Sequence, residues 1–370
     1  MSQRSIFIHR HAPAPLVDWG KALASQLIVW HHLALYGPLP RMAMPLLPDL
    51  LSELLDAARL MVQVFLVIGG FLAARSLMPR PGLSGTLVAA RLPALLWQRY
   101  WRLAKPALPA IALALLAAAV ARMVMDDADT PASPGWLGLL ANVFMLQDLL
   151  GEPALSAGLW YLAIDLQLFM MLAALSCLLG LRWLRGSATA SWLLVGGLTA
   201  ASLFVFNLDS SLDAWGLYFF GAYGLGVMAQ WVHASAHRRA GTLALALLCA
   251  LALWVEWRSR LALASTVALL LAGGWSTRLN AGLAGSRANS LAQQLARLSY
   301  PLFLLHYPVS LLMASIVTLI WPESAGFCLL GLLAAWAASL LLAAALQAWL
   351  EPTRRAPAQP ATLPSGWATR

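Results

Sequence analysis

Three histidines and one aspartate lie inside long apolar stretches of this chain, where ionisable side chains are rare. They are His31, His32, Asp165 and His306, with Gln63 and Gln167 as neutral polar neighbours. An ionisable side chain in hydrocarbon costs about 2.5–3.5 kcal/mol on insertion scales, so each one that persists is a functional candidate. A neutral imidazole is tolerated more cheaply and exchanges protons near neutral pH. Any one histidine could be a simple interhelical hydrogen bonder, but three with a carboxylate favour proton chemistry.

A second group of candidates is cationic. Arg99 and Arg102 form an RxxR pair, and on a helix this spacing places both guanidiniums on one face. Two forked cations side by side suit a phosphate or pyrophosphate. The alternative is that they only anchor a helix at the inner membrane boundary. The segment 90–106 that carries them is typical of an amphipathic helix at that interface.

The elements that must position these residues are membrane-spanning helices. Of 370 residues, 61% are hydrophobic and only 11% are charged, and the mean hydropathy is +0.74, which excludes a soluble multidomain protein. Runs such as 240–257 are apolar on every face, which excludes the alternating strands of a β-barrel. We predict an all-α polytopic membrane protein with about ten spans, near 20–37, 57–77, 105–125, 158–181, 190–208, 214–233, 240–257, 260–277, 299–321 and 325–350.

The basic residues predict the orientation of this bundle. If the N-terminus is cytoplasmic, nineteen of the 24 Lys and Arg residues fall on the inner side. The outer side keeps only Arg41, Arg59, Arg122, Arg258 and Arg260. This bias predicts that both termini are cytoplasmic.

One apolar segment, 136–151, does not fit the pattern of the spans. It is short and carries Asn142, Gln147 and Asp148, and counting it as a span would invert every later loop. We expect it to be re-entrant or to lie at the outer interface.

The rest of the chain offers no separate domain. We divide it into a cytoplasmic segment at 1–18, which lacks the apolar region of a signal peptide, the transmembrane domain at 19–351, and a Pro- and Ala-rich tail at 352–370 that we expect to be disordered. The formal charge of +9 reports orientation, and no nucleic-acid partner is expected.

Neither disulfides nor a metal site are expected. Each cysteine, Cys177, Cys249 and Cys328, lies in an apolar run without a CxxC spacing. The acidic residues of the segment 126–129 have small polar and apolar neighbours, which is typical of a solvated turn.

In the order of these unusual residues the chain resembles the acyltransferase-3 family of integral membrane O-acyltransferases. Lys21 and His32 are separated by ten residues, as in the R/K-x10-H pattern of that family. The segment QVFLVIGGFLAAR (63–75) is similar to its FFVLSGF segment, and Arg99 with Arg102 match its RxxR.

Two later segments complete a resemblance that extends from about residue 18 to 350. LWYLAIDLQLF (159–169) is similar to the WSLAVEEQF segment of the family, and LSYPLFLLHYPV (298–309) to its SYxxYLxHxP ending. The chain departs from the family at three places. Gly69 and Tyr161 stand where serines are usual, and Asp165 with the following leucine replaces a Glu pair.

The resemblance implies a transferase that moves an acyl group, most often acetyl, onto a hydroxyl of a cell-envelope glycan such as lipopolysaccharide or exopolysaccharide. Acetyl-CoA would be the cosubstrate, and no bound cofactor is implied. The partners would be the acyl-CoA donor, an envelope glycan or lipid-linked sugar as acceptor, and the lipids of a bacterial inner membrane. Many relatives carry a hydrolase-like domain after the bundle; we expect none here.

The expected site combines the two groups of candidates. His32 would act as general base on the acceptor hydroxyl or as a transient acyl carrier, with Asp165 and His306 as its catalytic partners. Donor binding would fall to Lys21, Arg99 and Arg102. Supporting positions would be taken by His31, Trp160, Tyr161, Gln167 and Tyr300.

Two other functions compete with this interpretation. A proton-coupled transporter or lipid-glycan flippase would use the intramembrane His and Asp residues as a proton relay. A polyprenyl-phosphate glycosyltransferase would need an acidic loop after the first span, where Asp49, Glu53 and Asp56 lie. The glycosyltransferase would leave the spacing of Lys21 and His32 and the RxxR pair unexplained.

Overall fold

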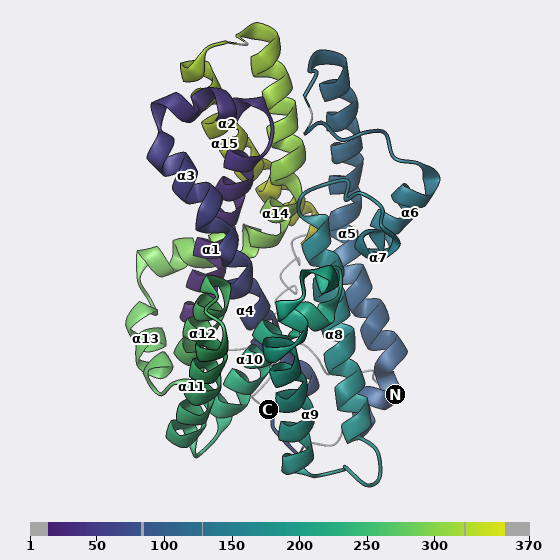
Figure 1. Ribbon diagram of the computed structural model, residues 1–370, viewed down its shortest axis with the longest axis vertical. Coiled ribbons are helices and arrows are strands. Elements are labelled where there is room, and N and C mark those ends of the chain that lie inside the picture. The colour runs from purple at the N-terminus through teal and green to yellow at the C-terminus, as the bar shows by residue number, and fades with distance from the viewer. Residues whose placement is uncertain (1–13, 83–84, 128, 322, 352–370) are drawn as a thin grey trace, which may run out of the picture.

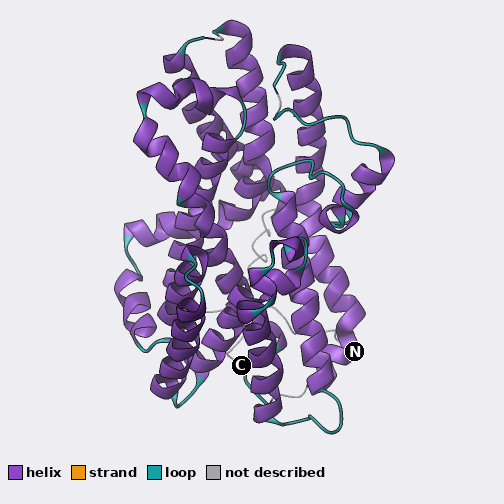
Figure 2. Cartoon of the chain, in the orientation of Figure 1, coloured by secondary structure: helices purple, strands orange, loops and turns teal. Residues whose placement is uncertain are grey.

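The described residues form an all-α bundle, as predicted. The structure is a computed structural model, and it describes residues 14–82, 85–127, 129–321 and 323–351. This part of the chain contains helices, turns and loops but no strand (Figure 2). Most of the long helices run along the long axis of the molecule (Figure 1).

Each of the ten predicted spans falls on one long helix. These helices are α1 (Pro15–Leu35), α4 (Val62–Leu77), α5 (Thr86–Val124), α8 (Leu159–Leu179), α9 (Ala188–Phe204), α10 (Gly216–Ala234), α11 (Arg238–Val255), α12 (Ser259–Ala272), α14 (Arg287–Ile320) and α15 (Ala325–Leu350). Shorter helices connect them: α2 (Pro38–Ala43), α3 (Pro48–Asp56), α6 (Trp136–Val143), α7 (Gln147–Leu150) and α13 (Trp275–Leu283). Single 3-10 turns at Met44–Leu46, Ala58–Met61, Phe206–Leu208 and Ser210–Leu212 complete the connections.

By length and composition, seven helical stretches among the described residues are able to cross a membrane. They are Pro48–Leu77, Thr86–Val124, Leu159–Leu179, Ala188–Leu208, Arg238–Val255, Arg287–Ile320 and Ala325–Leu350. The helices α1, α10 and α12 occupy the other three predicted spans. Thus the chain is a multi-pass membrane protein.

Three local features differ from or refine the predictions. The segment 90–106 is not a separate interfacial helix, because it forms the first half of α5, in which Pro106 does not end the helix. The predicted span at 260–277 is too long: α12 ends at Ala272, where Gly273 adopts extended backbone and supplies little helix propensity. The segment 136–151 forms only α6 and α7, and neither is long enough to span a bilayer.

The centre of the bundle is the contact between α4 and α10. A Cβ atom added at Gly70 would overlap the backbone carbonyl of Tyr223, and one added at Gly226 would overlap the carbonyl of Val67. The two backbones therefore touch, as small residues allow between membrane helices. Nearly every residue of α10 is buried.

This contact predicts a large difference between two glycine substitutions. Gly70→Ala is expected to lower the midpoint of thermal unfolding of the purified protein, because overpacking of this kind costs about 1–3 kcal/mol. Gly197→Ala on α9 is the matched control, since nothing lies within 4 Å of its added Cβ and alanine is the better helix former. Equal midpoints for the two variants would contradict the close contact.

Candidate active site

Helices α1 and α14 pack along each other and bring two of the predicted catalytic residues together. His32 lies in the last turn of α1, and His306 lies within α14. The Nδ1 atom of His32 is 2.8 Å from the Nε2 atom of His306. Their rings are stacked, with centroids 4.9 Å apart. His306 is fully buried and His32 is 7% exposed, so this contact is shielded from water.

The direction of the hydrogen bonds fixes which nitrogen of His32 is free. Nδ1 of His306 lies 3.2 Å from the carbonyl oxygen of Leu302, and because a carbonyl only accepts, this nitrogen carries the proton. In a neutral imidazole the other nitrogen, Nε2, then accepts, so Nδ1 of His32 must donate to it. The Nε2 atom of His32 is left unprotonated, which is the form that a general base or a nucleophile requires.

His31 lies beside this pair but faces another element. Its Nδ1 atom is 3.0 Å from the carbonyl oxygen of Leu54 on α3, although its ring lies 5.2 Å from that of His32. Adjacent helical residues point about 100° apart. The structure therefore places His31 between α1 and α3, away from the hydrogen-bonded pair.

Asp165 pairs with a predicted donor-binding residue. Its Oδ2 atom is 2.5 Å from an Nη2 atom of Arg99, and the guanidinium of Arg99 lies 4.9 Å from the ring centroid of Phe169. Both side chains of the ion pair are largely buried: that of Asp165 is 11% exposed and that of Arg99 is 18% exposed. The structure thus brings Asp165 to the cationic group and joins α5 to α8, while His306 alone bonds to His32.

Lys21 and Arg102 extend this cationic group. Arg102 is exposed and Lys21 is half-buried, and neither forms an ion pair within the described ranges. Lys21 lies within electrostatic range of Arg102, Arg99 and Asp165. Asp18 is a second carboxylate near Lys21, so three cations face two carboxylates and the group keeps a net positive charge, which suits a polyanion.

Aromatic rings connect the cationic group to the histidines. The ring of Tyr161 lies 5.7 Å from that of Phe303. The ring centroid of Phe303 lies 6.2 Å from that of His32 and 5.8 Å from that of His306. Tyr161 is also within electrostatic range of Arg99. These two rings therefore lie between Arg99 and the histidine pair.

The other predicted supporting residues hold helices in place. The hydroxyl of Tyr300 donates to the carbonyl of Leu103 at 2.8 Å, which fastens α14 to α5. The side chain of Gln167 accepts from the first backbone N–H of α10, at Gly216, at 2.8 Å. Trp160 packs with its ring 6.0 Å from those of Tyr161 and Phe219.

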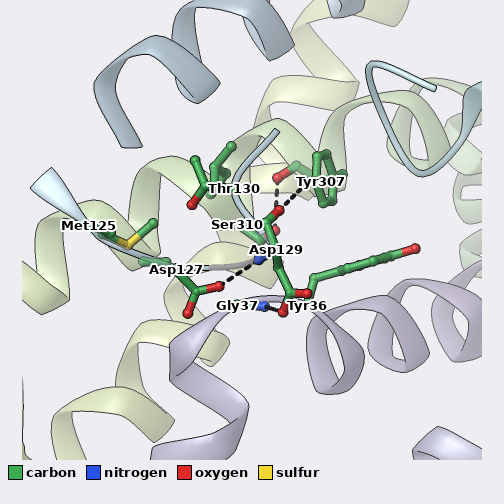
Figure 3. A pocket seen from close by; sticks show the side chains of 10 residues that line it. Tyr36, Gly37, Met125, Asp127, Asp129, Thr130, Tyr307 and Ser310 are labelled. Carbon is green, nitrogen blue, oxygen red and sulfur yellow. Dashed lines mark hydrogen bonds between the residues drawn. The ribbon is translucent and has the colours of Figure 1, made fainter. Parts of the chain in front are cut away.

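A small open pocket lies near His32, beside Tyr36 and Tyr307. Tyr36 forms one wall, since its ring lies 5.7 Å from that of His32 and 5.1 Å from that of Tyr307. Figure 3 shows these tyrosines around the pocket with Thr130 and Ser310. Tyr36 and Tyr307, which line the pocket, each adjoin a histidine of the pair, so the pocket lies close to His32.

Asp127 and Asp129 line this pocket, so for these two residues the description as a plain solvated turn is wrong. Asp127 and Asp129 both pair with Arg41 of α2. The carboxylate of Asp129 also accepts from the backbone N–H of Gly37 at 3.0 Å. In the part of the chain that the structure describes, no group of three His, Cys, Asp or Glu side chains could hold a metal ion.

Three tyrosines of the site were not predicted from the sequence. Tyr36 follows His32 by one helical turn and Tyr307 follows His306 directly, so the spacing offered a signal for both. Tyr223 of α10 offered none. Its hydroxyl is buried without a hydrogen-bond partner, and its ring would be 3.5 Å from a Cβ atom at Gly69, where the family usually has serine.

The buried ion pair predicts non-additive effects on stability. Asp165→Leu is expected to lower the thermal unfolding midpoint strongly, because breaking such a pair by removing one partner costs about 3–5 kcal/mol. The double variant Arg99→Met with Asp165→Leu should recover much of that loss. Arg102→Gln, which removes an exposed cation, should leave the midpoint unchanged. If the loss in the double variant equals the sum of the losses for Asp165→Leu and Arg99→Met alone, the two residues are not coupled.

Comparison with known proteins identifies the family of the chain. No curated protein and no solved structure matches the chain. A family model described as an acyltransferase domain, that of the acyltransferase-3 family, matches residues 15–343. This range begins with α1, ends within α15, and includes both histidines, the ion pair and the cationic group. The chain therefore belongs to the acyltransferase-3 family of membrane acyltransferases.

Proposed function

We propose that this acyltransferase moves an acetyl group from acetyl-CoA onto a hydroxyl of a cell-envelope glycan or glycolipid, in the bacterial inner membrane, and that His32 performs the proton transfer. The observation that carries this proposal is the chain of hydrogen bonds from Leu302 through His306 to His32. It leaves Nε2 of His32 as an unprotonated nitrogen in a buried site.

The reaction needs no group beyond the imidazole and the two substrates. Nε2 of His32 takes the proton of the acceptor hydroxyl while the hydroxyl oxygen attacks the thioester carbonyl. The carbon–sulfur bond breaks, and the thiolate of CoA takes the proton from the imidazolium. An ester and free CoA result. A transient acyl-imidazole would start from the same unprotonated nitrogen, so both routes depend on the same hydrogen-bonded tautomer.

The donor would enter from the side of the cationic group. Arg102 is exposed and Lys21 is half-buried, so both can meet the phosphates of CoA. Arg99 is held by Asp165 and would form the inner wall. The predicted orientation places all of these cations toward the cytoplasm, where CoA is found. The thioester arm would then pass Tyr161 and Phe303 to reach His32.

The acceptor would enter from the pocket beside Tyr36. That pocket offers the hydroxyl groups of Tyr36, Thr130 and Ser310 and the carboxylates of Asp127 and Asp129 (Figure 3). Such groups hydrogen-bond to sugar hydroxyls. The two substrates would thus meet at His32 from opposite faces of the bundle.

Substitution of the histidine pair tests the proposal. In inner membranes supplied with labelled acetyl-CoA, His32→Ala is expected to lower the transfer of label to the envelope glycan about 10²- to 10⁴-fold, the range for loss of a general base. His306→Phe keeps a ring but removes the acceptor for Nδ1 of His32, so we expect a loss of about 10- to 100-fold, typical of removing an orienting partner.

His31→Asn is the matched control for both variants. Asn offers a donor to the carbonyl of Leu54 and leaves the pair of His32 and His306 in place, so transfer should stay close to wild type. A folded His32→Ala protein with normal transfer would exclude His32 as the reacting base.

Donor binding has its own test. Arg102→Gln is expected to raise the KM for acetyl-CoA about tenfold with little change in kcat, since a charge-assisted hydrogen bond to phosphate contributes about 1.5–3 kcal/mol. Arg91→Gln removes another exposed cation from the same helix and should leave the KM unchanged. Equal KM values for the two variants would place the phosphates elsewhere.

A further inference from the structure

Two arginines at the start of α12 stand out by their position. Arg258 precedes Ser259, and Arg260 follows it. They are two of only five basic residues predicted on the outer side, where the positive-inside rule makes arginine scarce. Arg258 is 8% exposed, so one of the two is buried almost completely.

Neutral groups hold both guanidiniums in place. Arg258 donates to the side chain of Asn207 at 2.6 Å and to the carbonyl of Leu203 at 2.9 Å. Arg260 donates to the carbonyl of Asn207 at 3.0 Å and to the hydroxyl of Tyr218. These bonds use four of the ten N–H donors that two guanidiniums carry.

Within the described ranges, no carboxylate forms an ion pair with Arg258 or Arg260. The ion pairs among the described residues involve other arginines. Glu256 lies within electrostatic range of Arg258 but is exposed and forms no ion pair with it. The Nε atom of Arg258 is buried without a hydrogen-bond partner. Two neighbouring cations in a weakly polar setting are costly unless an anion joins them.

A shallow, open pocket lies beside Arg260. Arg260, Asn207, Tyr218 and the amide of Gln63 contribute its polar groups. Its remaining walls are apolar or small: Leu203, Phe219, Gly221, Ala222, Leu261 and Ala264. The pocket thus joins a cationic, hydrogen-bonding end to an apolar surface between α4, α10 and α12.

We infer that this pocket binds a phosphate group carried by a lipid on the outer side of the membrane. The guanidinium of Arg260 receives the phosphate oxygens, Arg258 supplies the second positive charge, and the apolar walls pack against the lipid chain. Arginine suits this task because its planar fork matches phosphate geometry. The site is separate from His32, since the rings of Phe219, Trp160, Tyr161 and Phe303 lie between them.

Binding of three probes to the purified protein in dodecyl maltoside tests the inference. The probes are dioctanoyl phosphatidic acid, inorganic phosphate, and dioctanoylglycerol, which has the chains but no phosphate. Dioctanoyl phosphatidic acid should bind and raise the unfolding midpoint of the wild type, whereas dioctanoylglycerol should not. If inorganic phosphate binds as tightly as dioctanoyl phosphatidic acid, the ligand of the pocket is a soluble phosphate. If inorganic phosphate binds more weakly, the ligand is a lipid phosphate.

Arg260→Gln should weaken the binding of dioctanoyl phosphatidic acid at least tenfold. Arg260 is preferred to Arg258 for this test because it lines the pocket, whereas Arg258 fastens the chain around Asn207. Arg122→Gln is the matched control: it removes another predicted outer arginine, whose guanidinium bonds to the carbonyl of Pro131. Equal binding by Arg260→Gln and wild type, or equal binding of dioctanoylglycerol and phosphatidic acid, would overturn the inference. None of these measurements depends on acyl transfer.

Discussion

The hydrogen bond between the imidazoles of His32 and His306 is the interaction on which the proposed chemistry depends. Two histidines in an apolar bundle stay neutral most cheaply, and two neutral imidazoles share one proton along the line that joins them. The carbonyl of Leu302 sets the direction of that sharing. A change in the packing of α1 on α14 would therefore change which nitrogen of His32 is available, even with both residues present.

Hydropathy predicted the helices well and their ends less well. The apolar runs predicted the positions of all ten main helices, because each run has about the length that a bilayer demands. The short α12 and the continuous α5 were not predictable from such runs: Gly273 ends one helix, and Pro106 fails to end the other. The end of α12 follows the low helix propensity of glycine, whereas in α5 the tertiary context overrides the local preference of proline.

The site residues were predictable as types, and their pairing was not. His32 and His306 are 274 residues apart, so no local spacing could show that they touch. Asp165 was predicted as an orienting or cavity-lining group, and it lies against Arg99, where it neutralises a cation that would otherwise be buried alone. Likewise Arg41 meets Asp127 and Asp129 only because the loop after α5 folds back onto α2.

The proposed reaction would draw its two substrates from different compartments. A cationic group lies at one end of the site and an open polar pocket at the other, with aromatic rings and the histidine pair between them. Membership of the acyltransferase-3 family favours acyl transfer over a transporter, a flippase or a glycosyltransferase. In the proposed reaction, the polar residues within the bundle would act on the two substrates, and only the acyl group would cross the membrane.

Sidedness is the most direct test of this account. Labelled acetyl-CoA would be added outside sealed inner-membrane vesicles prepared from the same cells in two orientations, inside-out and right-side-out. The account predicts label in the envelope glycan only with inside-out vesicles, where the cationic group faces the added donor. Equal labelling in sealed right-side-out vesicles would contradict it, because the donor would then reach His32 from the side assigned to the acceptor.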